Sequence, residues 1–254
     1  MLAPPISKPL PAAHVPARDP FFYGWRDVPR VLANGKEIYD RTPLTRDDFL
    51  HPQVGDFRMH NDDHERLCVY LYNVLAARLA SDPQAVVMHD VRVAWDQPHI
   101  RPHGPDISVI FGVRERKNWS TFEVEKEGVR PTLLVEVTSP GTRTLDLKTK
   151  LVEYEQVGVD YYVIVDTHTR RGEVIRQLLG YELTLDGYLA LRPNARGWLW
   201  LEPVELWLGL DGLTLECRDR EGNLLADYVT LTEQIRAETQ ARAQAETRAR
   251  AETQ

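Results

Sequence analysis

Hydrophobic and polar positions follow two different periods along this chain, and together they predict an α/β protein. Residues 61–80, NDDHERLCVYLYNVLAARLA, repeat leucine and valine at helical spacing after an acidic first turn, which predicts a helix. A second helix is predicted over 146–157, ended by Gly158. Short apolar runs predict strands at 85–94, 106–111, 131–139 and 160–166. Helices that alternate with strands in this order favour a mixed β-sheet flanked by helices.

Weaker patterns lie before, between and after these elements. The run RTPLTRDDFLHP predicts a short helix that begins after Thr45, whose hydroxyl group is suited to cap it. Residues 113–130 are polar and predict a solvent-facing loop or helix. Residues 173–216 alternate between apolar and polar positions, which predicts antiparallel hairpins at a sheet edge.

The two ends of the chain differ in composition from its middle. Residues 1–20 contain six prolines and few large apolar residues, so we expect a disordered or extended arm. Residues 229–254 end in RAETQARAQAETRARAETQ, whose apolar positions are only alanines. This tail predicts a solvated helix or a weak coiled coil in preference to a specific recognition helix. The folded domain is therefore expected over residues 21–228.

Composition and charge narrow the class of protein. Hydrophobic residues make up 43% and charged residues 27% of the 254 residues, as in a folded globular protein. The net charge of −7 counts against a general nucleic-acid coat protein, but a local groove or a bound metal still allows an enzyme that acts on nucleic acid. Two cysteines make no disulfide framework, and no run is apolar enough for a signal peptide or a membrane span. We expect a cytoplasmic protein with no membrane partner.

Two carboxylates stand at positions where the pattern predicts buried strands. Period-2 alternation places Glu136 and Leu134 on one face of the run LLVEVTS. A carboxylate there is costly unless it is paired or holds a metal; the alternative is a strand-end charge that reaches solvent. Asp106 begins the preceding predicted strand, directly after Pro105, and its alternative interpretation is a turn residue.

A lysine lies on the apolar side of the predicted helix 146–157. Leu147, Leu151 and Tyr154 form an apolar stripe at helical spacing. Lys150 is three residues after Leu147 and four before Tyr154, so it lies in the same stripe and faces the sheet. The alternative is a lysine whose stem packs while its ammonium group reaches water.

These three residue types together suit metal-dependent phosphodiester hydrolysis. Two carboxylates on neighbouring strands offer the oxygen ligands that Mg²⁺ prefers. An ammonium group beside them can orient an attacking water molecule or stabilise charge that develops on the phosphate.

The segment that carries these residues also resembles a known family. PDISVIF followed by LLVEVTSPGTRTLDLKTKLVEYEQVGVDYYVIVD closely resembles the Uma2 family of endonucleases, which belongs to the PD-(D/E)XK nuclease-like superfamily. The matching features are Pro-Asp on one strand, Glu-Val on the next, Asp-x-x-x-Lys, Gly-Val and a strand that ends in Val-Asp, over residues 105–166. Similarity extends over roughly residues 40–210. The resemblance implies a restriction-endonuclease-like core.

The resemblance also implies roles for individual residues. Asp106 and Glu136 match the acidic metal ligands, and the backbone carbonyl of Val137 would be a further ligand. The plain motif has lysine two residues after the glutamate, where this chain has Thr138. In this family the lysine is displaced to the following helix, which here points to Lys150.

Three further residues are accessory candidates. Asp146 matches the aspartate four residues before the lysine; it would cap the helix or bind Lys150, and the cap is the favoured interpretation. Glu65 or His64, near the start of the helix 61–80, would supply a further contact to the site, although acidic residues also serve helix N-termini.

The function that follows is cleavage of DNA by a Mg²⁺-dependent endonuclease, with Mn²⁺ as a substitute. Because both strands of DNA must be cut, a homodimer is a reasonable expectation. The alternative is a catalytically silent nucleic-acid-binding or interaction module on the same fold.

Other signals carry less weight. His99 and His103 are four residues apart, but the prolines around them exclude a helix, so a zinc site is disfavoured. Ser139 lacks an evident His/Asp arrangement. The Trp-rich run 197–207 would offer a base-stacking surface, but its alternation favours core or dimer packing. Three tyrosines are expected in the core or behind the site: Tyr154, Tyr161 and Tyr162.

Overall fold

The structure is a computed structural model, and its described residues form two compact units, within residues 1–58 and 59–254. It describes residues 20, 23–32, 34–35, 37–51, 56–57, 62–139, 142–226, 231–232, 235–242 and 244. The unit boundary falls within the domain predicted over 21–228, and those domain limits stay a prediction. The predicted arm 1–20 lies outside the described residues, apart from Pro20.

The first unit is a small antiparallel sheet with one short helix. Its strands are ordered β2-β1-β3, and they are β1 (Trp25–Val31), β2 (Glu37–Pro43) and β3 (Asp56–Phe57). Helix α1 (Arg46–Leu50) begins after Thr45, as predicted. The Thr45 hydroxyl accepts a hydrogen bond from the Asp48 amide at 3.1 Å, and the Asp48 carboxylate accepts one from the Thr45 amide at 3.0 Å. This reciprocal capping box satisfies donors that the first turn leaves open.

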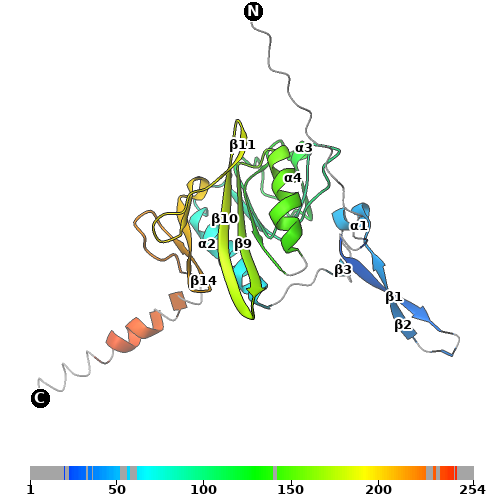
Figure 1. Ribbon diagram of the computed structural model, residues 1–254, viewed down its shortest axis with the longest axis horizontal. Helices are drawn as coiled ribbons and strands as arrows, with labels where there is room; N and C mark the ends of the chain where they lie inside the picture. The colour runs from blue at the N-terminus through cyan, green and yellow to red at the C-terminus, as the bar shows by residue number, and fades with distance from the viewer. Residues whose placement is uncertain are drawn as a thin grey trace, which may run out of the picture. The chain divides into compact units, whose positions relative to one another are not determined.

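The second unit is built on a mixed sheet of six strands, ordered β11-β10-β9-β8-β6-β4 (Figure 1). These strands are β4 (Val86–His89), β6 (Ile107–Ile110), β8 (Pro131–Val137), β9 (Tyr161–Arg170), β10 (Glu173–Thr184) and β11 (Gly187–Ala190). Strands β8 and β9 are parallel, and every other neighbouring pair is antiparallel. A parallel pair needs a crossover, and the helical segment after β8 provides it. The α/β class with a mixed sheet flanked by helices is therefore confirmed.

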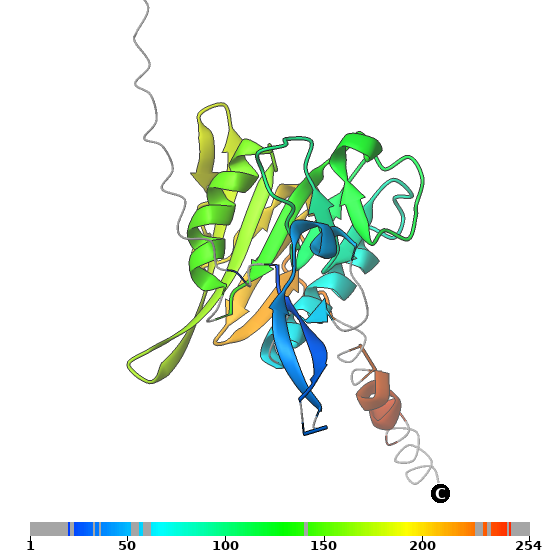
Figure 2. The same ribbon diagram turned by 90° about the vertical axis from the view of Figure 1, so that its right-hand side faces the viewer.

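Different layers cover the two faces of this sheet (Figures 1 and 2). Helix α2 (Asp62–Arg78) packs on one face, together with the three-stranded sheet of β12 (Leu199–Leu201), β13 (Leu206–Asp211) and β14 (Thr214–Arg218). Helix α4 (Lys150–Gln156) packs on the other face. Alternate side chains of β8 pack on opposite faces of the sheet. Leu133 lies in the core with α2, and Leu134 lies in the core with α4.

Two strand predictions are wrong in part. The strand predicted over 85–94 is interrupted at Asp90, whose φ of 51° lies in the left-handed region that aspartate tolerates. The second half becomes β5 (Arg92–Ala94), which leaves the main sheet and pairs with β7 (Thr121–Glu123). The hairpins predicted at one sheet edge over 173–216 also divide, since only β10 and β11 extend the main sheet.

The polar segment 113–130 is not simply solvent-facing. It contains β7 and the short helix α3 (Val124–Glu127), and Phe122 and Val124 are buried in the core beneath α4. Their isolated apolar side chains carry too little periodicity to predict this burial. The short 3₁₀ helix η2 (Glu202–Val204) joins β12 to β13.

In the tail, residues 235–242 are helical, as predicted; a coiled coil there stays a prediction. Among the described residues, no helix combines the length and the apolar character needed to cross a membrane.

Candidate metal and nuclease site

Asp106 and Glu136 come together because their strands are neighbours in the sheet. Antiparallel pairing of β6 with β8 places Ile107 opposite Val135. One step beyond this pair, the same register places Asp106 opposite Glu136, on one face of the sheet. Asp106 is 7% exposed and Glu136 is 2% exposed, so Glu136 is not a strand-end charge that reaches solvent.

Lys150 reaches the same place from the crossover. After β8 the chain forms one turn of π-helix, η1 (Leu145–Thr149), which continues directly into α4. Lys150 is 3% exposed, and its Nζ lies 2.8 Å from Glu136 Oε1 and 2.7 Å from Asp146 Oδ1. The apolar stripe correctly predicts that Lys150 faces inward. π-turns are rare and are frequent at functional sites.

The favoured interpretation of Asp146 as a helix cap is wrong. Residues 143 and 144 are already helical before the π-turn, so Asp146 lies inside the helical segment rather than at its cap, and it is 1% exposed. Its carboxylate forms the ion pair with Lys150 instead. Once the lysine is buried, a second carboxylate beside it offsets part of the cost of desolvating its charge.

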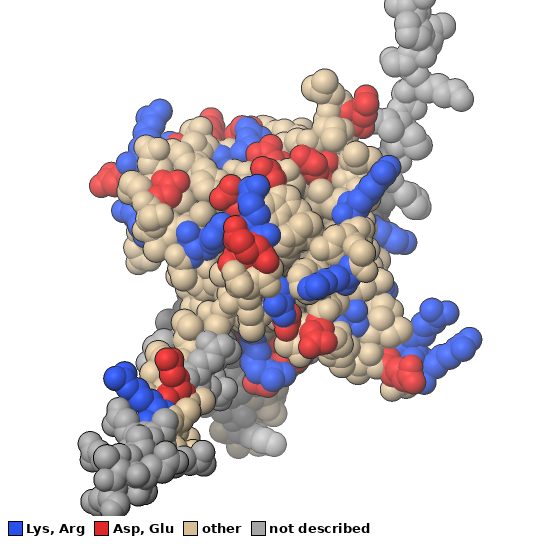
Figure 3. Space-filling view, turned by 90° about the vertical axis from the view of Figure 1, so that its left-hand side faces the viewer, with Lys and Arg blue, Asp and Glu red and all other residues tan. Residues whose placement is uncertain are grey.

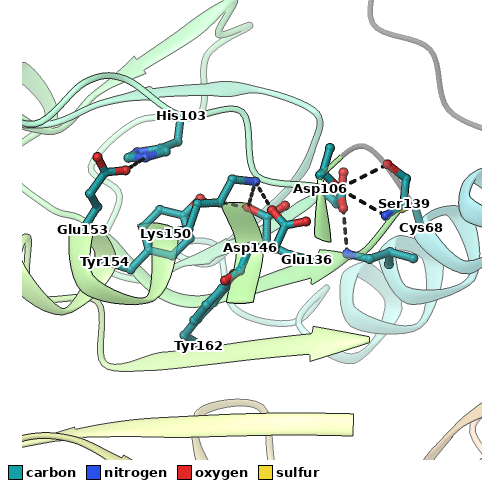
Figure 4. Close-up of polar contacts among 12 residues, drawn as sticks. Cys68, His103, Asp106, Glu136, Ser139, Asp146, Lys150, Glu153, Tyr154 and Tyr162 are labelled. Carbon is teal, nitrogen blue, oxygen red and sulfur yellow. Dashed lines mark hydrogen bonds and ion pairs between the residues drawn. The ribbon is translucent and has the colours of Figure 1, made fainter. Parts of the chain in front are cut away.

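Two tyrosines hold the acidic residues in place (Figure 4). The Tyr154 hydroxyl donates a hydrogen bond to Glu136 Oε1 at 2.8 Å. The Tyr162 hydroxyl donates to the backbone carbonyl of Asp146 at 2.9 Å, which ties the π-turn to β9. Both tyrosines are fully buried, so they belong to the core behind the site, as predicted.

The carboxyl groups of Asp106 and Glu136 differ in pKa. Burial raises the pKa of Glu136 to about 8, although Lys150 opposes this shift; the charges of Asp106 and Asp146 add to it. Burial also disfavours ionised Asp106, but its contacts with His64, its attraction to Lys150 and the backbone amide of Val137 outweigh that effect and lower its pKa. In the absence of a metal, the ionised carboxylate of this pair is therefore Asp106.

Asp106 has two close partners. Val137 N donates a hydrogen bond to its Oδ2 at 2.7 Å, and His64 Nε2 lies 3.2 Å from the same oxygen. Burial alone would lower the pKa of His64, but the hydrogen bond and charge of Asp106, with the charge of Glu65, raise it. His64 thus contacts the site as an accessory residue, whereas Glu65 is 47% exposed and lies 3.7 Å from His64 Nδ1.

Thr138 stands where the plain motif has its lysine, and it forms structural hydrogen bonds. Thr138 Oγ1 donates a hydrogen bond to Asp166 Oδ1 at 3.1 Å. Arg143 binds the same carboxylate through Nε at 2.6 Å and Nη2 at 2.8 Å, and Gln177 donates to it at 2.8 Å. This network joins the ends of β8 and β9 to the helical residues just before the π-turn. Thr138 therefore stabilises the frame of the site, and Lys150 supplies the ammonium group.

The charges of the site suit a cation. Three buried carboxylates belong to this site, and its one lysine contacts two of them, Glu136 and Asp146; Asp146 Oδ2 has no hydrogen-bond partner among the described residues. Carboxylate oxygens are the ligands that Mg²⁺ and Mn²⁺ prefer, and a bound cation would offset the excess negative charge. The residues present therefore fit a divalent metal ion.

Two groups of residues were not predicted from the sequence. Cys68 Sγ lies 3.6 Å from His64 Nδ1; the H-x-x-x-C spacing on a helix, which places both side chains on one face, is a signal that could have found it. His103 was considered only as a zinc ligand, but it accepts a hydrogen bond from Trp95 Nε1 at 2.7 Å and contacts Glu153 Oε2 at 2.7 Å. These partners come from distant segments and have no short sequence signature.

Removing the Tyr154 hydroxyl tests how far it supports the site. We expect Tyr154→Phe to lower the free energy of unfolding by about 1–2 kcal/mol, because the buried carboxyl group of Glu136 loses a donor. Tyr161→Phe is the matched control: its hydroxyl donates to Glu182 near the surface, and we expect a loss below about 1 kcal/mol. Urea denaturation measures both, and equal losses would contradict the role given to Tyr154.

The sequence also matches a known protein family. The Uma2 family model, described as "Putative restriction endonuclease", matches residues 56–211, more than half of the chain. The chain belongs to the Uma2 family. This membership supports a nuclease-like function for the protein.

One solved structure is also similar to this Uma2 protein. It is the crystal structure of "a putative nuclease belonging to DUF820" from Anabaena variabilis. The two chains share 16% sequence identity with a TM-score of 0.42, over 60% of this chain and 87% of that one. No curated protein matches the chain.

Proposed function

We propose that this Uma2 protein is a metal-dependent endonuclease that hydrolyses phosphodiester bonds in DNA. The observation that carries the proposal is the buried convergence of Asp106, Glu136 and Lys150. Burying such groups is costly for stability, and clusters of this kind are characteristic of functional sites. Membership of the Uma2 family supports the same assignment.

Each residue has a separate role in the proposed reaction. Asp106, Glu136 and the backbone carbonyl of Val137 would hold Mg²⁺, and Mn²⁺ would substitute for it. When bound, the ion supplies positive charge to the phosphate and lowers the pKa of water. Lys150 orients the attacking water molecule and stabilises negative charge that develops on the phosphate. Its ion pairs with Glu136 and Asp146 keep its side chain in one conformation.

The supporting contacts limit the movement of these groups. Tyr154 fixes one oxygen of Glu136, and the Val137 amide fixes one oxygen of Asp106. Such second contacts orient ligands and typically change metal affinity or activity by about 10- to 100-fold when removed.

The protein surface carries charges of both signs. On the face shown in Figure 3, basic and acidic side chains are interspersed. This agrees with the net charge of −7 and means that DNA contact depends on local basic groups and on the bound ion. We propose a homodimer for cutting both strands, a cytoplasmic location, and assistance to dimerisation from the helical tail.

Cleavage of supercoiled plasmid at low salt, with Mg²⁺ or Mn²⁺, tests the proposal. We expect the wild-type protein to nick or linearise the plasmid. Asp106→Asn keeps the size of the side chain but weakens a ligand, so we expect at least about a 100-fold loss of rate. Asp186→Asn is the control, because Asp186 lies exposed in the β10–β11 turn; it should cut at the wild-type rate.

The other outcomes have clear meanings. Equal cutting by the wild type and Asp106→Asn would show contamination or a different site. DNA binding with a steep salt dependence but without cutting would favour the nucleic-acid-binding module. Cutting of RNA or branched DNA in place of plasmid would change the substrate and leave the site unchanged.

A further inference from the structure

Three metal-binding side chains meet beside the site described above. His64 and Cys68 are one helical turn apart on α2, and Asp106 precedes β6. One ligand atom from each lies within 4.8 Å of the other two, and all three residues are buried. Among the described residues, this is the one group of this composition that the structure brings together.

We propose that His64, Cys68 and Asp106 form a second metal site, which takes a borderline divalent ion of the Zn²⁺ or Co²⁺ class. Imidazole and thiolate ligands suit these ions, whereas Mg²⁺ prefers oxygen ligands alone. The site is distinct from the Asp106–Glu136 set in its ligand chemistry, although the two share Asp106. The inference does not depend on nuclease activity.

The distances between the ligand atoms support this assignment. Tetrahedral Zn²⁺ separates a nitrogen from an oxygen ligand by about 3.3 Å, and a nitrogen from a sulfur ligand by about 3.6 Å. His64 Nε2 lies 3.2 Å from Asp106 Oδ2 and 4.0 Å from Cys68 Sγ. Cys68 Sγ lies within 4.8 Å of the Asp106 ligand oxygen, so binding needs the sulfur to move inward by about 1.2 Å at most. Three protein ligands leave one position of the tetrahedron for water.

The local fold holds the three ligands close to these positions. Residues i and i+4 lie on one helix face, so α2 presents His64 and Cys68 together. The Val137 amide anchors Asp106 Oδ2 at 2.7 Å. A site whose ligands are already positioned loses little conformational entropy on binding.

Cobalt spectroscopy of the full-length, tag-free, metal-stripped and reduced protein tests the site. Cys68 and Cys217 are the only cysteines in the sequence, so in Cys217→Ser protein any thiolate ligand must be Cys68. We expect Co²⁺ to give a thiolate-to-cobalt charge-transfer band in this variant and in the wild type. Equimolar Zn²⁺ should abolish the band, and equimolar Mg²⁺ should not.

Ligand variants complete the test. Cys68→Ser should abolish the charge-transfer band, and His64→Gln should weaken Zn²⁺ binding by at least about tenfold while leaving the thiol in place. Circular dichroism and thermal melting check that each variant folds. If Cys68→Ser does not fold, the test rests on His64→Gln. No band in Cys217→Ser protein, a band that survives Cys68→Ser, or unchanged Zn²⁺ affinity in folded His64→Gln would overturn the proposal.

Discussion

Replacing Lys150 with methionine is expected to lower the free energy of unfolding by about 3–5 kcal/mol. Lys150 is 3% exposed and forms ion pairs with Glu136 at 2.8 Å and with Asp146 at 2.7 Å. Methionine has a similar length, so packing changes little, but buried carboxyl groups lose their cation. Denaturation in urea or guanidinium measures the loss. The same variant should also lose plasmid cleavage under the proposed function.

Lys148 provides the matched control for this substitution. It is the other lysine of the same helical segment and is exposed, so Lys148→Met should change stability by no more than about 0.5 kcal/mol. Asp146→Asn/Lys150→Met should recover part of the loss, because it removes a carboxylate together with the ammonium group. Recovered stability without recovered cleavage would separate the two roles of Lys150. A Lys150→Met protein as stable as Lys148→Met would refute the buried ion pairs.

His103 is expected to make the protein less stable as the pH falls, by about 2 kcal/mol between about pH 7 and pH 5. Burial lowers the pKa of His103 to about 4, despite the opposing effect of Glu153; its ordinary value is 6.5. Between these two values the unfolded chain binds a proton that the folded protein does not. Stability from this group is therefore fully present above about pH 6.5 and is lost as the pH falls towards 4.

Comparison with His103→Gln isolates this effect. Glu136 contributes with the opposite sign, since burial raises its pKa and its contribution is lost as the pH rises. That contribution is common to both proteins and cancels in their difference. We therefore expect the difference in unfolding free energy between wild type and His103→Gln to shrink by about 2 kcal/mol over the same range. A difference that stays constant with pH would show that folding leaves the pKa of His103 unchanged, and a difference that grows as the pH falls would show that His103 is protonated in the folded protein.

The His103 contacts explain why the neutral form is favoured. Trp95 Nε1 donates to His103 Nδ1, so that nitrogen must be an acceptor, and Nε2 then carries the proton that faces Glu153. The ring also packs edge-on against Tyr154, with ring centroids 4.9 Å apart. Packing of His103 thus supports the tyrosine that orients Glu136. Figure 4 shows this order from Glu153 and His103 through Tyr154 to the acidic residues.

The sequence by itself determined the α/β class, the helix 62–78, most strands of the main sheet and the inward direction of Lys150. These features follow from local periods of 2 and 3.6 residues, which depend only on near neighbours. The helical cap at Thr45 and the helix stop at Gly158, with its φ of 75°, likewise depend on local chemistry.

Only the tertiary structure decided which side chains meet. Strand register, and which helix covers which face, decide three contacts. They are the contact of His64 with Asp106, the hydrogen bond of Tyr154 to Glu136, and the pairing of Asp146 with Lys150 rather than with the helix end. Asp90 likewise divides an apparently continuous strand between two sheets. Burial makes an unpaired charge costly, so the surroundings of each charged group, rather than its local pattern, select its partner.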